Sequence, residues 1–557
     1  MVVVFIILPS VCRCAESLPF LFSHVAPLMG LPSKLRGKTG GDWRNSARRV
    51  AIHRADRKPL VRWVEATMSE ILEDFESCYR VSESRDPRYD GIFFIATTST
   101  RIYCRPSCPA RMAKRASVRF YPTAAAAQTA GFRACKRCRP DAAPGSPEWN
   151  WRADIVARAM RLIADGTVDR EGVSGLGMRL HFSDRHLRRL LTEQVGASPV
   201  ALARAQRAST ARLLIESTAM PLADVAFAAG FHSVRQFNDT IRDVFASTPS
   251  EMRSRSKGAS PRAKGASPKT PGVVELRLSC REPFDGAALL RFLEVRAVPG
   301  LEEVSRGTYR RALTLAHGIG IVELTPEPRA VRCVLRLDLR DLAPAIARCR
   351  RLLDLDADPV AISEALGDDE VIGALVQERP GLRVPGCVDG AELALRTVLG
   401  QQMSLQAGRA QTARIVQRFG TPLEQPIGMV THLFPATAIL AEADPESIGG
   451  SVQRREALQT LAARLASGEV HIDAGSDPAE GITQLRAIRG IGPWAAAHVA
   501  MRGFHDPDAF PQNDAGLRRA LRLLGQRDDP RSIGVLQHRW RPWRAYATLQ
   551  LWTSLDH

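Results

Sequence analysis

Two short-spaced pairs of cysteines are the residues with the clearest chemistry in this chain. They are Cys104-Arg-Pro-Ser-Cys108 and Cys135-Lys-Arg-Cys138. Two such pairs, separated by a stretch long enough to fold back, are typical of a tetrahedral zinc site built from thiolates. Basic residues flank both pairs, and no Asp or Glu lies between them. The spacing alone fits a structural zinc knuckle, whereas the basic setting favours chemistry or binding at a polyanion.

The residues around these cysteines closely resemble the N-terminal domain of the Ada protein, over about residues 80–145. The similar stretches are residues 86–94, 97–111 and 130–140. The resemblance implies that the thiolate of Cys104 accepts a methyl group from a methylphosphotriester in DNA. It also implies that Thr100 and Arg111 contact the DNA backbone, although ordinary surface residues are the alternative for both.

Methylation of Cys104 would also change the charge of the zinc site. A thiol must be a thiolate to attack carbon, and zinc holds a bound cysteine deprotonated at neutral pH. Four thiolates on one Zn²⁺ leave two net negative charges, and methylation removes one of them. One charge removed at ~8 Å from a phosphate, at an effective dielectric of ~40, is worth roughly 1 kcal/mol per phosphate. The sequence therefore predicts a switch in which repair raises DNA affinity.

The size and charge of the chain limit the classes of protein to which it can belong. At 557 residues it is too long for one core, so three or four domains are expected. A net charge of +18 and a hydrophobic content of 45% fit a globular protein that binds nucleic acid. Cysteines outside the zinc cluster are scattered, which favours a reducing, cytoplasmic compartment. The apolar residues 1–8 are too few for a membrane span and lack the basic start of a signal peptide.

Two segments divide the chain. Residues 1–67 are basic and aperiodic and are expected to be a poorly ordered extension, and Met68 opens a helix-like pattern and is an alternative start of translation. Residues 253–272 contain Lys-Gly-Ala-Ser-Pro twice and predict a flexible basic linker. The linker separates a predicted zinc domain (68–145) and a helical domain (150–252) from the C-terminal half.

The helical domain contains two similar units. Each has a small helix, a turn and a serine able to cap a second helix, Ser183 in the first unit and Ser233 in the second. The basic and amide side chains of the second helices that are able to reach base edges are Arg185, His186, Arg188, Arg189, Arg235, Gln236 and Asn238. The doublet resembles the AraC-type double helix-turn-helix domain. A plain helical bundle with a charged, solvated face is the alternative.

The region from residue 273 to 385 is predicted to be an α+β domain. Strands are expected at residues 273–278, 320–324 and 331–337, and a helix at 286–296. Residues 283–300 resemble the N-terminal domain of 3-methyladenine DNA glycosylase II (AlkA). No residue in this region has an obvious chemical role.

The last region, residues 386–557, is predicted to be all-α and contains a Gly490-Ile-Gly492 turn. Two glycines let the backbone turn tightly and bring amide N–H groups at a helix start onto a DNA phosphate. With Asp514 further along the chain, the turn resembles the helix-hairpin-helix base-excision glycosylase superfamily. The resemblance implies that Asp514 is the catalytic aspartate, and simple helix capping is the alternative. A carboxylate there would stabilise the positive charge that develops on the sugar as an N-glycosidic bond breaks.

Four further positions follow from this resemblance. Members with lyase activity carry a Lys just after the hairpin, where this chain has Trp494, so a monofunctional glycosylase is expected. Trp494 and Trp552 match aromatic pocket positions of the AlkA family and suit a cationic alkylpurine, with core packing as the alternative. His498 replaces a pocket Tyr. Gln402 replaces a Leu in the segment that wedges into the duplex.

Together the resemblances imply a multidomain α+β protein in which an Ada-type regulator is fused to an AlkA-type glycosylase. Its expected cofactor is Zn²⁺, and its expected partners are double-stranded DNA and RNA polymerase. We expect a cytoplasmic, nucleoid-associated monomer that accepts methyl groups, activates transcription and excises 3-methyladenine and related bases. A Pro-Cys-His-Arg motif, as in the second methyl-accepting domain of Ada, is absent. The alternatives are a regulator with a non-catalytic C-terminal module and a glycosylase with a purely structural zinc domain.

Overall fold

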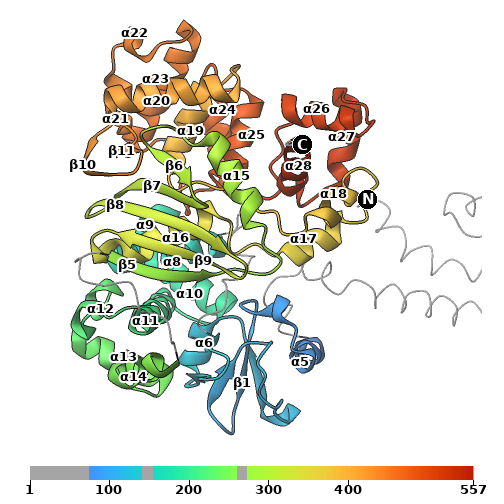
Figure 1. The fold of residues 1–557 in the computed structure, drawn as a ribbon. Coiled ribbons are helices and arrows are strands. Elements are labelled where there is room, and N and C mark those ends of the chain that lie inside the picture. Colours follow the sequence, from blue (N-terminus) through green and yellow to red (C-terminus); the bar gives the residue numbers. More distant parts are fainter. Residues whose placement is uncertain (1–73, 141–154, 260–272, 556–557) are drawn as a thin grey trace, which may run out of the picture. The chain divides into compact units, whose positions relative to one another are not determined.

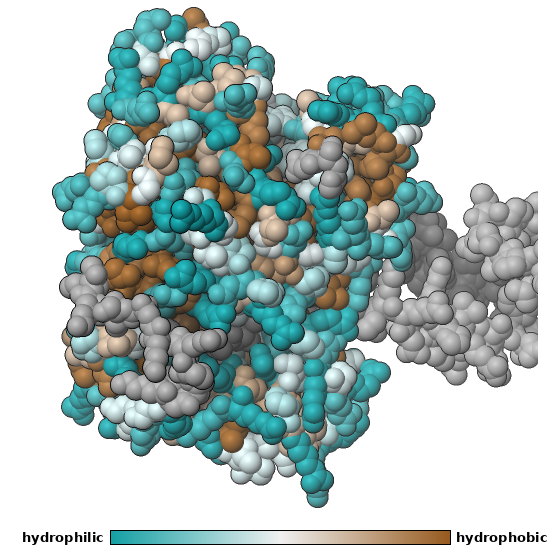
Figure 2. Space-filling model, viewed as in Figure 1, coloured by the Kyte–Doolittle hydropathy of each residue, from teal (hydrophilic) through white to brown (hydrophobic). Residues whose placement is uncertain are grey.

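The computed structural model describes residues 74–140, 155–259 and 273–555 (Figure 1). The chain divides into two units, Met1–Glu65 and Ala66–His557, and every described residue lies in the second. The predicted extension at 1–67 and the alternative start at Met68 lie outside the described residues. Among the described helices, none combines the length and the apolar character that a membrane span requires. The face in Figure 2 is largely hydrophilic, with hydrophobic residues in separate patches.

A four-stranded sheet in the order β3-β1-β2-β4 forms the centre of residues 74–140. Its strands are β1 (Phe94–Thr97), β2 (Ile102–Cys104), β3 (Val118–Tyr121) and β4 (Arg133–Ala134). The helical elements are α5 (Phe75–Ser84), η3 (Pro87–Tyr89), η4 (Arg115–Ser117) and α6 (Ala124–Thr129). The side chains of Asp74 and Thr123 cap α5 and α6. Buried Phe93 and Tyr103 fill the core, as expected of a small α/β domain.

Seven α-helices make up the described residues 155–259. They are α8 (Ile155–Ala164), α9 (Thr167–Leu180), α10 (Asp184–Val195), α11 (Pro199–Ser217), α12 (Leu222–Ala228), α13 (Val234–Phe245) and α14 (Pro249–Ala259). Helix α11 contacts α9 and α10 on one side of the doublet and α12 and α13 on the other. The long central helix therefore joins the two predicted units.

Helix α14 corrects the predicted start of the linker at residue 253. The helix continues to Ala259, because Thr248 and Glu251 cap its start reciprocally and no proline interrupts the chain before Pro261. The rest of the predicted linker lies outside the described residues.

An antiparallel sheet in the order β5-β9-β8-β7-β6 follows. Its strands are β5 (Val273–Ser279), β6 (Glu302–Ser305), β7 (Thr308–Leu315), β8 (Gly318–Glu327) and β9 (Ala330–Arg336). The accompanying helices are α15 (Gly286–Arg296), η6 (Leu339–Asp341), α16 (Leu342–Leu352), α17 (Pro359–Leu366) and α18 (Gly373–Glu378). The three predicted strands and the predicted helix are confirmed. The β6–β7 hairpin escaped prediction because Arg310 and Arg311 interrupt its apolar run.

The C-terminal part, orange to red in Figure 1, is mostly helical. Its helices are α19 (Gly390–Leu399), α20 (Leu405–Phe419), α21 (Thr437–Glu442), α22 (Pro445–Ile448), α23 (Val452–Ser467), α24 (Pro478–Arg486), α25 (Pro493–Arg502), α26 (Ala515–Leu523), α27 (Pro530–Arg539) and α28 (Arg544–Thr553). The all-α prediction is wrong for one hairpin, β10 (Pro422–Ile427) with β11 (Val430–His432). Pro422 and Pro426 disfavour a helix there, and Gly428 turns the chain at a φ of +60°.

Candidate functional site

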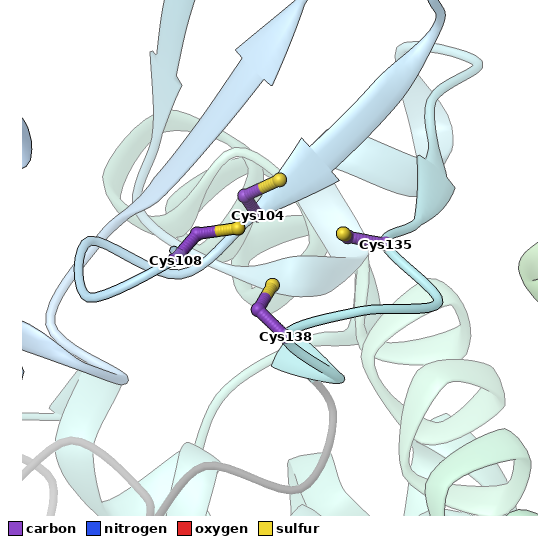
Figure 3. Close-up of side chains that lie close together, drawn as sticks. All are labelled: Cys104, Cys108, Cys135 and Cys138. Carbon is purple, nitrogen blue, oxygen red and sulfur yellow. The ribbon is translucent and has the colours of Figure 1, made fainter. Parts of the chain in front are cut away.

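The four cysteines of the predicted cluster come together at the ends of neighbouring strands (Figure 3). Parallel pairing of β2 with β4 places Cys104, the last residue of β2, beside the turn that carries Cys135 and Cys138. The amide of Cys135 donates a hydrogen bond to the carbonyl of Tyr103 at 3.0 Å, which continues this pairing. Together with Cys108, the Sγ atoms all lie within 4.8 Å of one another, and the side chains point toward a common centre.

This donor set fits a zinc ion. A tetrahedral site with Zn–S bonds of about 2.3 Å has sulfur–sulfur edges of about 3.8 Å, which the cluster accommodates. Hydrogen bonding with Cys108 and Cys138, together with burial, raises the pKa of the Cys104 thiol well above its ordinary value. A dication at the centre would supply the charge that four neighbouring thiolates require. Cys104 is partly exposed, whereas the other three cysteines are buried.

Asp90 fixes the loop between Cys104 and Cys108, a role that the sequence did not indicate. Its carboxylate accepts hydrogen bonds from the Ser107 amide at 3.0 Å and the Ser107 hydroxyl at 2.7 Å, and it lies 3.2 Å from Arg105 Nη1. Burial raises the pKa of Asp90, and these partners oppose that shift. The surroundings of the cysteines are therefore less basic than predicted, because an acidic residue from outside the segment folds onto them.

The predicted DNA-binding side chains lie on α10 and α13, the second helix of each unit. The Ser183 hydroxyl accepts a hydrogen bond from the His186 amide at 3.3 Å, and the Ser233 hydroxyl accepts one from the Gln236 amide at 3.2 Å. Both predicted helix starts are thus confirmed. The exposed side chains among the predicted set are Arg185, Arg188, Arg189, Arg235 and Gln236, with His186 and Asn238 partly exposed. Thr100 and Arg111 of the zinc domain are also exposed.

Asp514 accepts hydrogen bonds at both of its carboxylate oxygens. Oδ1 accepts from the Leu517 amide at 2.8 Å and from Trp552 Nε1 at 2.8 Å. Oδ2 accepts from Trp494 Nε1 at 2.9 Å. A Cβ on Gly516 would lie 3.3 Å from Trp552 Cδ1, so the glycine leaves room for this ring. Asp514 therefore does cap α26, and its capping carboxylate also accepts hydrogen bonds from two indole rings.

His498 joins the same cluster from the second turn of α25. Its ring stacks on that of Trp494, with centroids 5.4 Å apart and planes 14° apart. Its Nδ1 lies 3.1 Å from Thr397 Oγ1 on α19. Burial, with the nearby charge of Arg502 and two further arginines, holds the pKa of His498 well below its ordinary value, so the ring is neutral. Sequence reasoning missed Thr397, since no short-range pattern links it to a histidine so far along the chain.

Gly490 and Gly492 shape the turn between α24 and α25. Gly490 has a φ of +94°, and a Cβ there would lie 2.9 Å from the Cβ of Ala457. Gly492 precedes α25, and no side chain caps the start of that helix. The first amides of α25 are thus not engaged by a capping side chain, an arrangement that suits an anion.

Gln402 lies in the loop between α19 and α20. It is exposed and has a φ of +55°, a conformation that costs a non-glycine residue about 1–2 kcal/mol. Arg454 Nη2 donates a hydrogen bond to the Gln401 carbonyl at 2.6 Å, which supports the neighbouring backbone. Backbone strain of this kind clusters at functional positions.

Three family models match the chain. Residues 77–141 match the metal binding domain of Ada, residues 176–255 match a helix-turn-helix domain, and residues 275–389 match the AlkA N-terminal domain. The cysteine cluster and Asp514, which caps α26, agree with these matches. Together they define a class of protein in which an N-terminal half that binds metal and DNA is joined to a C-terminal half of the AlkA type.

Curated relatives identify the family. A protein of Mycobacterium tuberculosis, named "Probable bifunctional transcriptional activator/DNA repair enzyme AlkA", is 54% identical over 87% of this chain and 97% of its own length. Escherichia coli DNA-3-methyladenine glycosylase 2 is 34% identical over 49% of this chain and 95% of its own length. The Escherichia coli bifunctional transcriptional activator/DNA repair enzyme Ada is 41% identical over 24% of this chain and 36% of its own length. The chain belongs to the family of bifunctional transcriptional activator/DNA repair enzymes, as an Ada–AlkA fusion.

Family membership bears on several predictions. The multidomain α+β fold is confirmed, as is zinc as the metal of the cysteine cluster. The protein is a DNA-binding protein with an enzymatic role in DNA repair.

Proposed function

We propose that the C-terminal half is a monofunctional DNA-3-methyladenine glycosylase with Asp514 as its catalytic carboxylate. As the bond between C1′ and the base nitrogen breaks, the base leaves with the bonding electrons and positive charge develops on the sugar. The Asp514 carboxylate stabilises that charge, and a water molecule adds to C1′ and releases a proton to the solvent. Trp494 occupies the position at which a lyase carries its Schiff-base lysine, which supports base release without strand cleavage.

The pair of indole N–H groups on Asp514 is the observation that carries this proposal. They fix the orientation of the carboxylate and bring two electron-rich rings beside it. A cationic alkylpurine favours such rings through stacking and cation–π contacts. Trp494, Trp552 and His498 therefore form the proposed base pocket, and both tryptophans are only partly buried against the core.

Two further groups position the DNA in this proposal. The glycine turn at Gly490 and Gly492 presents the start of α25 to a phosphate of the damaged strand. Gln402 enters the duplex and fills the gap that the flipped nucleotide leaves. Its exposed, strained position in the α19–α20 loop supports this role.

We propose that Cys104 is the methyl acceptor of the zinc site and also one of its four ligands, with Cys108, Cys135 and Cys138. Zinc, when bound, keeps these sulfurs in the thiolate form. The Cys104 sulfur attacks the methyl carbon of the phosphotriester, a sulfur–carbon bond forms, and the carbon–oxygen bond breaks. The phosphate oxygen keeps the electron pair, so a normal phosphodiester is restored and the protein is irreversibly methylated. Partial exposure of Cys104 alone among the four favours it as the acceptor.

The helical domain would convert this methylation into gene regulation. Loss of one negative charge from the zinc site strengthens the attraction of Thr100, Arg111 and the surrounding basic surface to phosphate. Helices α10 and α13 would then read promoter sequence and recruit RNA polymerase. We propose that the chain acts as a cytoplasmic, nucleoid-associated monomer. We propose functional domains at residues 68–145, 150–259, 273–385 and 386–557, with the second domain extended to the end of α14.

One incubation tests both activities. The zinc-loaded full chain is mixed with methylated duplex DNA, and free 3-methyladenine is quantified. The peptide containing Cys104 is then analysed by mass spectrometry for one added methyl group. Both products are expected. Base release without the methyl group would make the zinc domain purely structural. Methylation without base release would leave the C-terminal half as a non-catalytic module, and neither product would refute both proposals.

A further inference from the structure

The histidine of the proposed base pocket is oriented by a specific hydrogen bond. His498 Nδ1 lies 3.1 Å from the hydroxyl oxygen of Thr397. That hydroxyl donates its own proton to the carbonyl of Leu393 at 2.8 Å. A hydroxyl has one proton, so toward His498 the Thr397 oxygen is an acceptor. With the hydroxyl proton engaged in this way, the proton of the imidazole is assigned to Nδ1.

This arrangement leaves Nε2 of His498 as a hydrogen-bond acceptor. A neutral imidazole carries one proton, and the other ring nitrogen keeps its lone pair. The positive charges of Arg502, Arg296 and Arg396 add to burial in keeping the ring neutral. The side chain is partly exposed, and no hydrogen bond of Nε2 occurs among the described residues. An acceptor nitrogen is thus available on a ring that stacks against Trp494.

The position of this ring connects it to the reaction centre. Trp494 covers one face of His498 and donates its indole N–H to Asp514 at 2.9 Å. The imidazole, the indole and the carboxylate therefore form one continuous set of contacts. A base bound beside Asp514 and Trp494 is therefore close to the imidazole of His498.

We propose that Nε2 of His498 determines base specificity by accepting a hydrogen bond from the 6-amino group of an alkylated adenine. This inference rests on the proposed glycosylase activity. An alkylated adenine presents an amino group at its 6-position, where an alkylated guanine presents a carbonyl oxygen. A carbonyl oxygen facing Nε2 would bring two lone pairs together, and the acceptor would be left unpaired. Thr397 is the positioning residue that keeps Nδ1 protonated and Nε2 free of a proton.

3-Methyladenine and 3-methylguanine form a matched pair of substrates for testing this role. Both carry the methyl group on the same ring nitrogen. At the 6-position 3-methyladenine has an amino group and 3-methylguanine a carbonyl oxygen, and 3-methylguanine also carries an amino group at the 2-position. Duplex DNA treated with a methylating agent contains both, so one reaction gives the ratio of their release rates. We expect the full chain to favour 3-methyladenine by about 10–100-fold, the scale of discrimination by one hydrogen bond in a closed pocket.

His498→Phe keeps a stacking ring and removes the acceptor. The release ratio should fall toward unity, mainly through slower release of 3-methyladenine. Thr397→Val removes the hydroxyl that fixes the protonated nitrogen and should also lower the ratio. Thr397→Ser retains a hydroxyl and should keep the ratio of the unsubstituted chain. A general loss of packing would slow the release of both bases alike and would leave the ratio of their release rates unchanged.

The outcomes separate the inference from the activity on which it rests. An unchanged ratio in His498→Phe, with both bases still released, would overturn the inference and leave the glycosylase intact. An unchanged ratio in Thr397→Val would overturn the positioning role and, with it, the assigned proton position. If the unsubstituted chain releases neither base, the glycosylase proposal itself fails, and the specificity role fails with it.

Discussion

Replacement of Asp514 by Asn should abolish base excision while DNA binding is retained. The Asn side chain has nearly the same shape, but one oxygen becomes an NH₂ donor. Oδ1 accepts two N–H groups and Oδ2 accepts one, so the amide oxygen should take the Oδ1 side. The cap on Leu517 and the bond from Trp552 then survive. The NH₂ group instead faces the indole N–H of Trp494, where two donors meet.

Two energies follow from this geometry. A full negative charge at ~4 Å from the sugar cation, at an effective dielectric of ~20, is worth about 4 kcal/mol. Since about 1.4 kcal/mol corresponds to a factor of ten in rate, excision should slow by roughly 10³-fold. Leaving the Trp494 N–H without an acceptor should lower the free energy of unfolding by about 1–3 kcal/mol. The catalytic loss is therefore expected to be larger than the structural loss.

Single-turnover release of 3-methyladenine measures the loss of catalysis, and thermal unfolding measures the loss of stability. Gel-shift titration measures DNA binding. Trp494→Phe keeps the ring but removes one donor, so excision should slow by about tenfold, the worth of one hydrogen bond to a charged group. Asp528→Asn is the control, because Asp528 follows the same helix and its ion-pair partners among the described residues are Arg518 and Arg522. If Asp514→Asn excises within tenfold of the unsubstituted chain, the electrostatic argument is refuted.

Three further predictions concern other parts of the chain. Removal of zinc by a chelator, or Cys138→Ser, should expose residues 74–140 to proteolysis and leave 3-methyladenine release unchanged; a protease-resistant domain would contradict a folding role for the metal. Gly490→Ala should lower the free energy of unfolding by about 1–2 kcal/mol, because its φ is +94° and its Cβ would meet Ala457. In Gly492→Ala the added Cβ has no atom within 4 Å, so the free energy of unfolding should be unchanged while DNA binding weakens in a filter assay. Equal effects of the two variants on stability and DNA binding would count against the hairpin role. Burial lowers the pKa of His505 to about 3, so between about pH 6.5 and 3 the unfolded chain binds more protons and stability falls as the pH falls. His505→Asn, which suits the φ of +56°, should reduce that loss by up to about 1.4 kcal/mol per pH unit in urea unfolding, and an unchanged slope would show that His505 does not titrate in this range.

Features that depend on neighbouring residues could be predicted from the sequence. Ser183 and Ser233 were identified as helix caps because a cap acts on an amide three positions away. The helix at Gly286–Arg296 has the predicted bounds, with Asp285 capping its start. The cysteine cluster also follows a local rule, since each pair supplies two ligands at short spacing.

Contacts between distant segments could not be predicted in the same way. Asp90 reaches the cysteine loop from outside the basic segment, and Thr397 meets His498 from another helix. Both are polar side chains whose partners are set by tertiary packing rather than by spacing. The β10–β11 hairpin could not be predicted for a different reason. Most residues of β10 are exposed and β11 has only three residues, so neither strand gives a clear apolar alternation.

The structural and catalytic interpretations of Asp514 support each other. A capping aspartate normally holds one amide and contributes about 1 kcal/mol to helix stability, which Ser or Asn provides equally well. Here the cap at Leu517 fixes one oxygen, and the indoles of Trp494 and Trp552 fix the remaining orientation of the carboxylate. A charge that is already oriented stabilises a developing cation without further reorganisation, which is the main source of electrostatic catalysis. The start of α26 therefore positions the carboxylate, and the hydrogen bonds from the two indoles distinguish it from an ordinary helix cap.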